Sequence, residues 1–186
     1  MGEIMNYYNE IKNKLIDNEI YNKVKDYSKE KHKVVTYYDI GKLLYEAGKA
    51  YGEDIIGIYA KKLQTEVGKK YNRSTLFRMR QFYILFSNEK IAPLAQQLSW
   101  SHYIELLPIK DDNKILYYIN QCINLNLTRD ELRLRIKNKE YERLDDETKS
   151  KLITQEPPVV TDFIKNPIII KNRNNYDVVS EKYYNN

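Results

Sequence analysis

Residues 72–83 of the chain read NRSTLFRMRQFY, and they hold three arginines and three aromatic residues. At about 100° per residue, the apolar side chains of a helix through this stretch fall within one arc and are expected to face a core. They are Leu76, Met79, Tyr83 and, just beyond the stretch, Phe86. Ser74, Arg78 and Gln81 lie nearly opposite, with Arg73 and Phe77 on the shoulder. The stretch therefore predicts an amphipathic helix whose polar side faces outward.

A second helix is expected immediately before this one. Apolar residues recur at helical spacing through residues 55–67 and end at Gly68, which is interpreted as a structural helix stop. Asn72 is a good N-cap for the following helix, because its side chain can accept a backbone hydrogen bond. This order of helix, glycine-containing connection and helix is typical of a helix-turn-helix. The connection is longer than the tight form, because Lys69 and Lys70 intervene before Tyr71.

Positive charge is concentrated in the same region. The whole chain has 31 Lys and Arg against 26 Asp and Glu, a formal charge of +5. Residues 58–81 alone carry seven cations against one anion, Glu66, which gives a local charge of +6. The rest of the chain is therefore close to neutral, and the charge favours an acidic partner at this one place.

These residues predict an interface for double-stranded DNA. Cations in the connection and the two helices would contact phosphates and supply non-specific, salt-sensitive affinity. They are Lys61, Lys62, Lys69, Lys70, Arg73 and Arg80. The residues expected to face bases are Ser74, Phe77, Arg78 and Gln81, since arginine prefers guanine and glutamine prefers adenine. The alternative is a solvated basic face on a purely structural helix.

The bulk composition fits one folded domain with appendages. The chain has 186 residues, of which 42% are hydrophobic and 31% charged. A single cysteine, Cys122, excludes an internal disulfide and a multi-cysteine zinc site. No apolar run is long enough to span a bilayer and no secretory signal is present, so the expected location is the cytoplasm, without membrane association. No cofactor or metal site is expected.

The remaining pattern is mainly α-helical. Apolar positions at helical spacing through residues 6–48 predict one or two long N-terminal helices, with a break or cap at Asp17 and Asn18. A turn is expected at residues 51–53. Further helix starts are predicted at Ser99, at Asp111 or Asp112, and at Thr128, where Glu131 completes a capping box. Leu132, Leu134 or Arg135, and Ile136 are expected to form the inward face of that last helix.

The segment LSWSHY, residues 98–103, has the residue types of a catalytic site but not its spacing. Its serines and His102 have no carboxylate partner at a diagnostic distance in sequence. A capped helix start, with Trp100 buried and His102 hydrogen-bonded, is the better interpretation. Beyond residue 145 the chain changes character, with a Gln155-Glu156-Pro157-Pro158 linker signal. We therefore expect a helical domain over residues 1–145 and a linker with a weakly structured tail over residues 146–186.

Six short motifs in this order resemble the N-terminal domain of the YhcG-type bacterial proteins, which are assigned to the PDDEXK nuclease superfamily. The resemblance covers about residues 7–145. The motifs are YDIGK (38–42), YG (51–52), LQTEVG (63–68), MRQFY (79–83), QLSWSHY (97–103) and YERL (141–144). The resemblance implies a helical, winged-helix-like DNA-binding module placed ahead of a nuclease domain. The tail does not continue into the metal-binding carboxylates and catalytic lysine of such a domain, so no catalytic residue is carried over.

The sequence therefore predicts a multi-helix bundle that contains a helix-turn-helix or winged-helix-like unit, with a long N-terminal helical segment and an irregular tail. Its expected function is non-enzymatic binding of double-stranded DNA, which would position a nuclease or related effector. The expected protein partner is a nuclease-domain protein or a second copy of the chain. The alternative function is a protein-interaction or oligomerisation module, motivated by the tyrosine-striped segment from Tyr7 to Tyr45.

Overall fold

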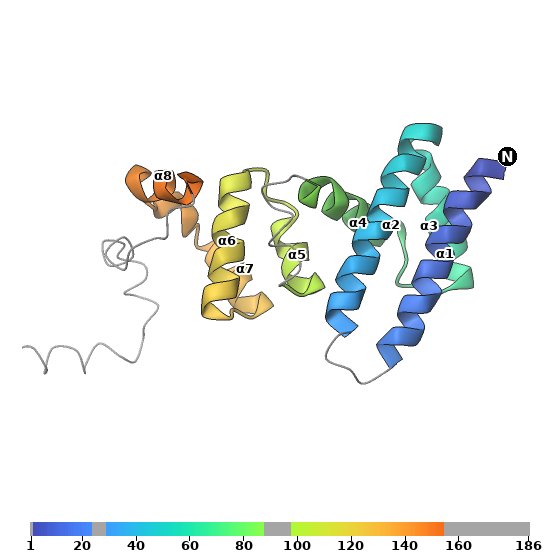
Figure 1. Ribbon diagram of the computed structural model, residues 1–186, viewed down its shortest axis with the longest axis horizontal. Helices are drawn as coiled ribbons and strands as arrows, with labels where there is room; N and C mark the ends of the chain where they lie inside the picture. The colour runs from blue at the N-terminus through green and yellow to red at the C-terminus, as the bar shows by residue number, and fades with distance from the viewer. Residues whose placement is uncertain (1, 24–28, 88–97, 155–186) are drawn as a thin grey trace, which may run out of the picture.

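The computed structural model describes residues 2–23, 29–87 and 98–154. These residues form α-helices and one short 3-10 helix, and they contain no strand (Figure 1). The elements are α1 (Gly2–Lys23), α2 (Lys29–Tyr51), α3 (Asp54–Glu66), α4 (Arg73–Phe86), α5 (Trp100–Leu106), α6 (Asp112–Leu125), α7 (Arg129–Lys137), η2 (Tyr141–Arg143) and α8 (Asp146–Thr154). The prediction of a mainly α fold is confirmed, while the strands of a winged helix are not among the described residues.

The N-terminal helix is longer than the sequence predicted. α1 runs without interruption through Asp17 and Asn18, so the predicted break at these residues is wrong. Asn18 is fully buried on the inner side of α1, and its amide has no hydrogen-bond partner within the described residues. A polar residue that reads as a cap in the sequence is therefore part of the helix interior. The turn after α2 is where it was expected, and Gly52 adopts a left-handed φ of 83° there.

The second helix is the centre of the N-terminal half. α1, α3 and α4 all contact α2, as Figure 1 shows. The closest approach is between Gly41 of α2 and α4, where a β-carbon on Gly41 would lie 2.9 Å from the carbonyl carbon of Met79 and nearer still to its oxygen. It would also lie 2.8 Å from Cβ of Tyr83. Only a glycine lets the two helix backbones meet at this point.

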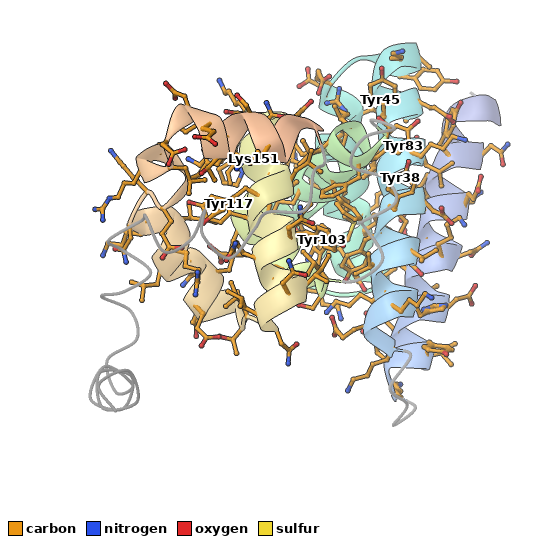
Figure 2. All side chains as sticks on the ribbon, turned by 60° about the vertical axis from the view of Figure 1, so that its left-hand side comes forward. Tyr38, Tyr45, Tyr83, Tyr103, Tyr117 and Lys151 are labelled. Atoms are coloured by element: carbon orange, nitrogen blue, oxygen red, sulfur yellow. The ribbon has the colours of Figure 1, made fainter. Side chains whose placement is uncertain are left out.

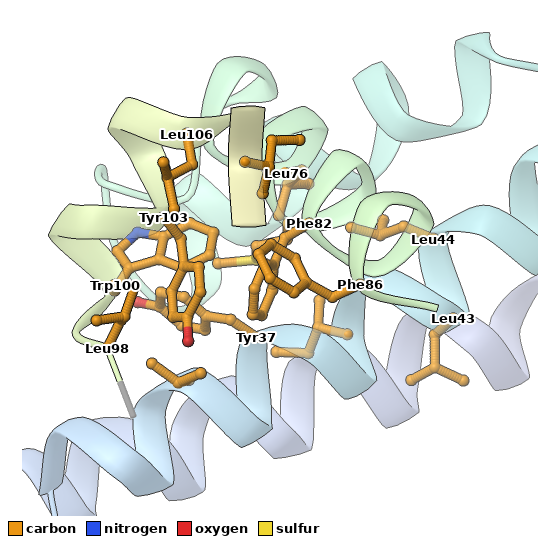
Figure 3. Close-up of a cluster of buried hydrophobic side chains, with 14 of the residues drawn as sticks. Tyr37, Leu43, Leu44, Leu76, Phe82, Phe86, Leu98, Trp100, Tyr103 and Leu106 are labelled. Carbon is orange, nitrogen blue, oxygen red and sulfur yellow. The ribbon is translucent and has the colours of Figure 1, made fainter. Parts of the chain in front are cut away.

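An aromatic cluster joins the two halves of the molecule. Phe82 and Phe86 project from α4 toward α5 and meet Tyr103 at centroid distances of 4.7 and 5.0 Å (Figure 3). Trp100 contacts Phe82 at 5.4 Å and Tyr37 of α2 at 4.9 Å, both edge to face. The predicted burial of Trp100 is confirmed. Phe82 is also buried, although the sequence analysis did not place it in the core, while Tyr83 is only partly buried.

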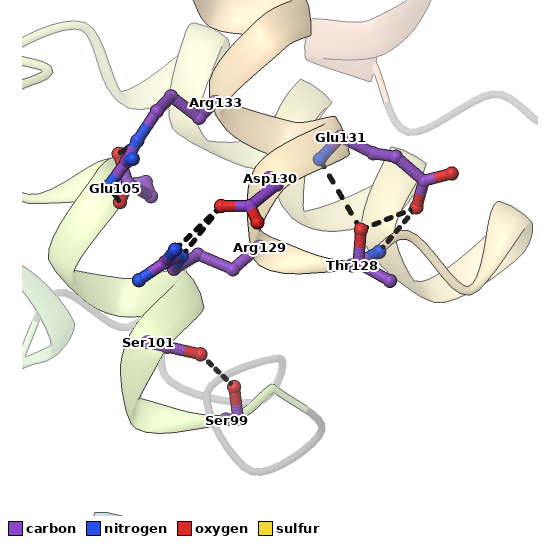
Figure 4. Close-up of polar contacts among 8 residues, drawn as sticks. All are labelled: Ser99, Ser101, Glu105, Thr128, Arg129, Asp130, Glu131 and Arg133. Atoms are coloured by element: carbon purple, nitrogen blue, oxygen red, sulfur yellow. Dashed lines mark hydrogen bonds and ion pairs between the residues drawn. The ribbon is translucent and has the colours of Figure 1, made fainter.

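Polar contacts fix the start of α5. His102 Nε2 lies 2.9 Å from the carbonyl oxygen of Leu127, which can only accept, so Nε2 carries the proton and donates it. His102 Nδ1 then accepts from the Ser99 hydroxyl at 2.7 Å. Ser101 in turn donates to Ser99 at 2.8 Å, and Figure 4 shows this pair of serines. The predicted structural role of His102 is confirmed. Ser99 does precede the helix, but its side chain bonds these partners instead of capping the backbone.

The C-terminal half is built around α6, which contacts α7, η2 and α8. Asp111 caps α6, accepting from the backbone of Asn113 and Lys114. Thr128 and Glu131 form the predicted capping box at the start of α7 (Figure 4).

Of the two alternatives predicted for the inward face of α7, the structure selects Arg135, and a further helix follows residue 145. Leu132 is buried, but Leu134 is 52% exposed, so Arg135 rather than Leu134 belongs to the inward face. Residues 146–154 form α8 against α6, so the helical part of the chain extends beyond residue 145. The linker signal at residues 155–158 and the expected irregular tail lie outside the described residues.

The contact at Gly41 generates a stability prediction. We expect Gly41→Ala to lower the free energy of unfolding by about 3 kcal/mol, because the added methyl group must push the α4 backbone away from α2. Gly68→Ala is the matched control: an added β-carbon there meets nothing within 4 Å and the backbone is not left-handed. It should leave stability unchanged or raise it by up to about 1 kcal/mol. Equal denaturant midpoints for the two variants would contradict the close-packing argument.

The buried tyrosines generate a prediction for alkaline pH. Burial raises the pKa of Tyr37, Tyr59 and Tyr117 from 10.0 to about 12. The unfolded chain therefore releases these protons at lower pH than the folded chain does, so their contribution to stability is full below pH 10 and is lost between about pH 10 and 12. We expect helical circular dichroism to fall and phenolate absorbance to rise together in this range. Phenolate formation near pH 10 with intact helices would contradict the burial.

Candidate nucleic-acid interface

The connection between α3 and α4 sets the direction in which α4 leaves the core. After α3 ends, the Leu63 carbonyl accepts from the amides of Val67 and Gly68 at 2.9 and 3.0 Å. The chain then turns, with the Tyr71 amide donating to the Gly68 carbonyl at 3.0 Å. The stop lies where it was predicted, but Gly68 is not left-handed and has open space around it. The hydrogen bonds to Leu63, rather than a special glycine conformation, end the helix.

Tyr71 anchors this connection in the core. Its ring is fully buried, and its hydroxyl donates a hydrogen bond to the carboxylate of Glu19 on α1. The same carboxylate lies 2.6 Å from Nζ of Lys70. Burial alone would raise the pKa of Glu19, but the hydrogen bonds from Lys70 and Tyr71 outweigh it and lower that pKa below its usual 4.5. One carboxylate thus fastens the connection to α1.

α4 begins as the sequence predicted. Asn72 caps it, with the side-chain oxygen accepting from the Thr75 amide at 3.0 Å. Ser74, Arg78 and Gln81 are all exposed along the helix. The prediction that these three side chains face away from the core is confirmed.

Two other predicted residues of this helix pack against each other at its N-terminal end. The Arg73 guanidinium lies 5.3 Å from the centroid of the Phe77 ring. Phe77 itself is only partly buried and packs on the edge of the core. Arg73 also reaches α3, because a β-carbon on Gly57 would lie 3.9 Å from its Nε. Phe77 therefore supports Arg73, and its ring is less available to a base than the three outward residues.

An open groove of about 680 Å³ lies between α3 and the start of α4. Its lining combines cationic, hydroxyl and amide side chains with apolar residues of α3 and one carboxylate, Asp54. The lining residues are Asp54, Gly57, Ile58, Ala60, Lys61, Gln64, Asn72, Arg73 and Ser74. The groove brings together Lys61, Arg73 and Ser74 from the predicted site.

The predicted phosphate contacts divide according to their neighbours. Lys61, Lys69 and Arg78 are exposed and form no ion pair within the described residues. Lys70 is also exposed, but it is paired with Glu19. Lys62 lies over the ring of Tyr8 at 5.3 Å, which turns it toward α1 and away from the groove lining.

Arg80 is the predicted phosphate contact that the structure does not bring to this surface. Its side chain is only 16% exposed and forms an ion pair with Glu53. It extends along α2, where a β-carbon on Gly48 would lie 3.8 Å from its Cζ, and its guanidinium is 5.9 Å from the Tyr45 ring. The helical position of Arg80 places it on the side of α4 that faces α2. A count of charges along the sequence does not distinguish this side from the outward side.

Sequence reasoning missed Glu19 as a residue that supports the candidate interface. It lies on another helix, 52 residues before Tyr71, and nothing in the sequence pattern links the two. Tyr71 could have been recognised from the sequence. It is an aromatic residue that follows two lysines and precedes the N-cap Asn72, and this order suggests a turn anchored in the core.

Within the described residues the structure thus defines an all-α domain. Its capped helix α4 exposes a polar face that forms no ion pair there, beside the basic connection from α3. Residues 5–143 match the family model described as the DUF1016 N-terminal domain, and the chain belongs to this family. No curated protein and no solved structure is significantly similar to the chain.

The described residues contain neither a metal-binding cluster nor a helix that could span a membrane. No group of three or more His, Cys, Asp or Glu side chains there is placed to hold a metal ion. None of the helices in those residues has the length and apolarity needed to cross a bilayer.

The Glu19 contact generates a prediction for acidic pH. Because the pKa of Glu19 is lowered in the folded chain, its contribution to stability is full above about pH 4.5 and is lost as the pH falls through the folded value. Glu19→Gln should therefore be less stable than the parent near neutral pH, by about 1–2 kcal/mol, and the two should converge at low pH. Urea midpoints across this pH range measure the difference.

The matched control is Glu30→Gln, which removes a carboxylate paired with Lys33 one turn along α2, where Glu30 is 45% exposed. A surface pair of this kind contributes little, so this variant should follow the parent at every pH. A Glu19→Gln variant that also follows the parent would contradict the anchoring role of Glu19.

Proposed function

We propose that the chain is a cytoplasmic, non-enzymatic module that binds double-stranded DNA and positions an effector, such as a nuclease, supplied by another chain. The observation that carries the proposal is the outward face of α4. Ser74, Arg78 and Gln81 are exposed there, and Arg78 forms no ion pair within the described residues. In helix-turn-helix proteins the second helix enters the major groove with its N-terminal residues against base edges, and this face is free for that role.

The phosphate contacts would come from the groove and the connection. Lys61 and Arg73 line the groove, and Lys69 stands exposed at the tip of the turn. These cations flank the start of α4, so they would hold the backbone while the helix reads the groove. Asp54 lies at the same groove and would disfavour a phosphate placed directly beside it, so the strand would pass closer to Lys61 and Arg73.

Base contacts would come from Arg78 and Gln81. Arginine can donate two hydrogen bonds to guanine, and glutamine can pair with adenine through one donor and one acceptor. The support for the effector is the resemblance to the N-terminal domains that precede a nuclease domain in YhcG-type proteins.

The rival function is a protein-interaction module, motivated by the tyrosine stripe of the N-terminal helices. Much of that stripe packs inside the molecule. Tyr8 is 4% exposed and lies 5.4 Å from the ring of Tyr59, and Tyr7 meets Tyr51 at 6.4 Å. These contacts reduce the aromatic surface that the stripe exposes to a partner, and they therefore favour the DNA-binding proposal.

The test is a titration of labelled duplex DNA at low and at physiological salt. With three backbone contacts, from Lys61, Lys69 and Arg73, the slope of log K against log salt should be about −3. Arg78→Ala combined with Gln81→Ala should weaken duplex binding at least about tenfold, because each lost base contact costs about 1–3 kcal/mol. The melting temperature should hardly change, since both side chains are exposed.

The matched control is Arg143→Ala, which removes the same charge from an exposed position on η2. It should bind the duplex as the parent does. If the Arg78 and Gln81 double variant also binds like the parent, or if binding does not depend on salt, the assignment of α4 as the recognition helix is wrong. Salt-insensitive self-association would favour the interaction module instead.

A further inference from the structure

A row of three tyrosines lies along the seam between α2 and α4. Tyr83 of α4 stands between Tyr38 and Tyr45 of α2, with ring centroids 5.2 Å and 5.6 Å away. Figure 2 shows the three side chains one below another beside α2. All three are partly buried, and Tyr38 rests against the buried ring of Phe82 at 5.9 Å. We call Tyr38, Tyr83 and Tyr45 the tyrosine ladder. One side of these rings packs on the core, and the other side reaches the surface.

Cations alternate with the rings along α2. At about 100° per residue, positions 38, 42, 45 and 49 fall on one side of the helix, so rings and lysines follow one another there. Lys42 and Lys49 are both exposed. Nζ of Lys49 lies 4.5 Å from the centroid of the Tyr45 ring. A long, exposed lysine can swing aside and keep its charge close to whatever lies on the ring.

The other charges at this seam are already committed to each other. Arg80 lies 5.9 Å from the Tyr45 ring and is paired with Glu53, so it fixes the ring and the pair adds no net charge. Lys42 and Lys49 therefore leave the edge of the ladder positive. Asp39 beside Tyr38 is paired with Lys14 at 3.1 Å, and Glu46 lies one helical turn from both Lys42 and Lys49, so it offsets one of their two charges and leaves a net charge of +1.

We propose that the tyrosine ladder is a binding site for single-stranded nucleic acid, with unpaired bases stacked on the rings and Lys42 and Lys49 against the phosphates. Rings interleaved with cations are the arrangement by which proteins hold single strands, because every base offers a π face and every nucleotide a charge. The three rings meet one another edge to face or tilted, at 62° and 52°, so the ring face that a base can reach is that of Tyr45, beneath the exposed side chain of Lys49. A base on this face must come from a single strand, because the bases of an intact duplex are already stacked on one another.

This site is separate from the proposed duplex-binding face. At about 100° per residue, Tyr83 and Arg78 lie about 140° apart around α4. The ladder lies on the flank of α4 that faces α2, whereas Ser74, Arg78 and Gln81 face away from the core. Binding of a single strand does not require that the duplex-binding proposal be right, and a variant of one surface leaves the other intact.

The test is a titration of the full chain with labelled oligothymidine and oligouridine at low salt. Tyr45→Leu should weaken binding of the single strand about tenfold, the effect expected when one base loses its stacking partner. Tyr45→Phe, which keeps the ring, should bind within about twofold of the parent. Duplex binding should be the same for all three proteins. The two oligonucleotides distinguish DNA from RNA as the source of the strand.

Two further variants keep the experiment decisive. Tyr51→Leu removes a partly buried tyrosine from the opposite side of α2 and should not change single-strand binding. Lys42→Ala combined with Lys49→Ala alters only exposed residues, and it should make single-strand binding less dependent on salt even if Tyr45→Leu fails to fold. Failure of the parent to bind either oligonucleotide, or equal binding by Tyr45→Leu and the parent, would overturn the proposal.

Discussion

The structure depends on one close contact, the approach of the α4 backbone to Gly41 of α2. Because no side chain separates the helices there, the Met79 carbonyl comes within contact distance of α2. The short distance between the two helices brings the apolar side of α4 into contact with α2, and Leu76, Met79 and Phe82 are all buried. The same contact orients α4 so that its aromatic residues reach α5. Both halves of the molecule therefore take their relative position from a residue that contributes no side chain.

The polar side of α4 follows from this constraint and from the anchor at its start. A helix held tightly along one side exposes the opposite side without loss of stability. Tyr71 and Glu19 hold the connection, so the first turn of α4 does not depend on Ser74 or Arg78 for its position. Side chains that are not needed for folding can be selected for what they bind.

The helix caps and the helical periodicity were predicted correctly because each depends on residues that are close together in the sequence. The Asn72 cap and the Thr128 capping box involve residues three positions apart, and both formed as predicted. The outward direction of Arg78 followed from helical periodicity alone. The predicted break at Asp17 failed because contacts on both sides of it hold α1 against the rest of the chain: Leu15 is fully buried and Glu19 bonds to Tyr71, and these contacts override the weak helix propensity of Asp17 and Asn18.

Contacts between distant segments could not be predicted from one sequence. Arg80 and Arg78 are equivalent in a count of charges, yet only the packing of α4 on α2 turns Arg80 toward Glu53. Phe82 was missed because the core wraps further around α4 than the expected arc, and this depends on the position of α5. Of the candidate site, the exposed face was therefore predictable, whereas its anchoring by Glu19 was not.

The central place of α2 has a consequence for synthesis on the ribosome. The chain emerges from its N-terminus, so α1, α2 and α3 are made before the helix that covers Gly41. Until α4 follows, α1 and α3 can cover part of α2, but the side that carries Gly41 stays open to chaperones or to other nascent chains. A translational pause after α2 has left the ribosome but while α4 is still inside it would prolong that exposure, and codon choice downstream of α4 would then affect yield without changing the protein.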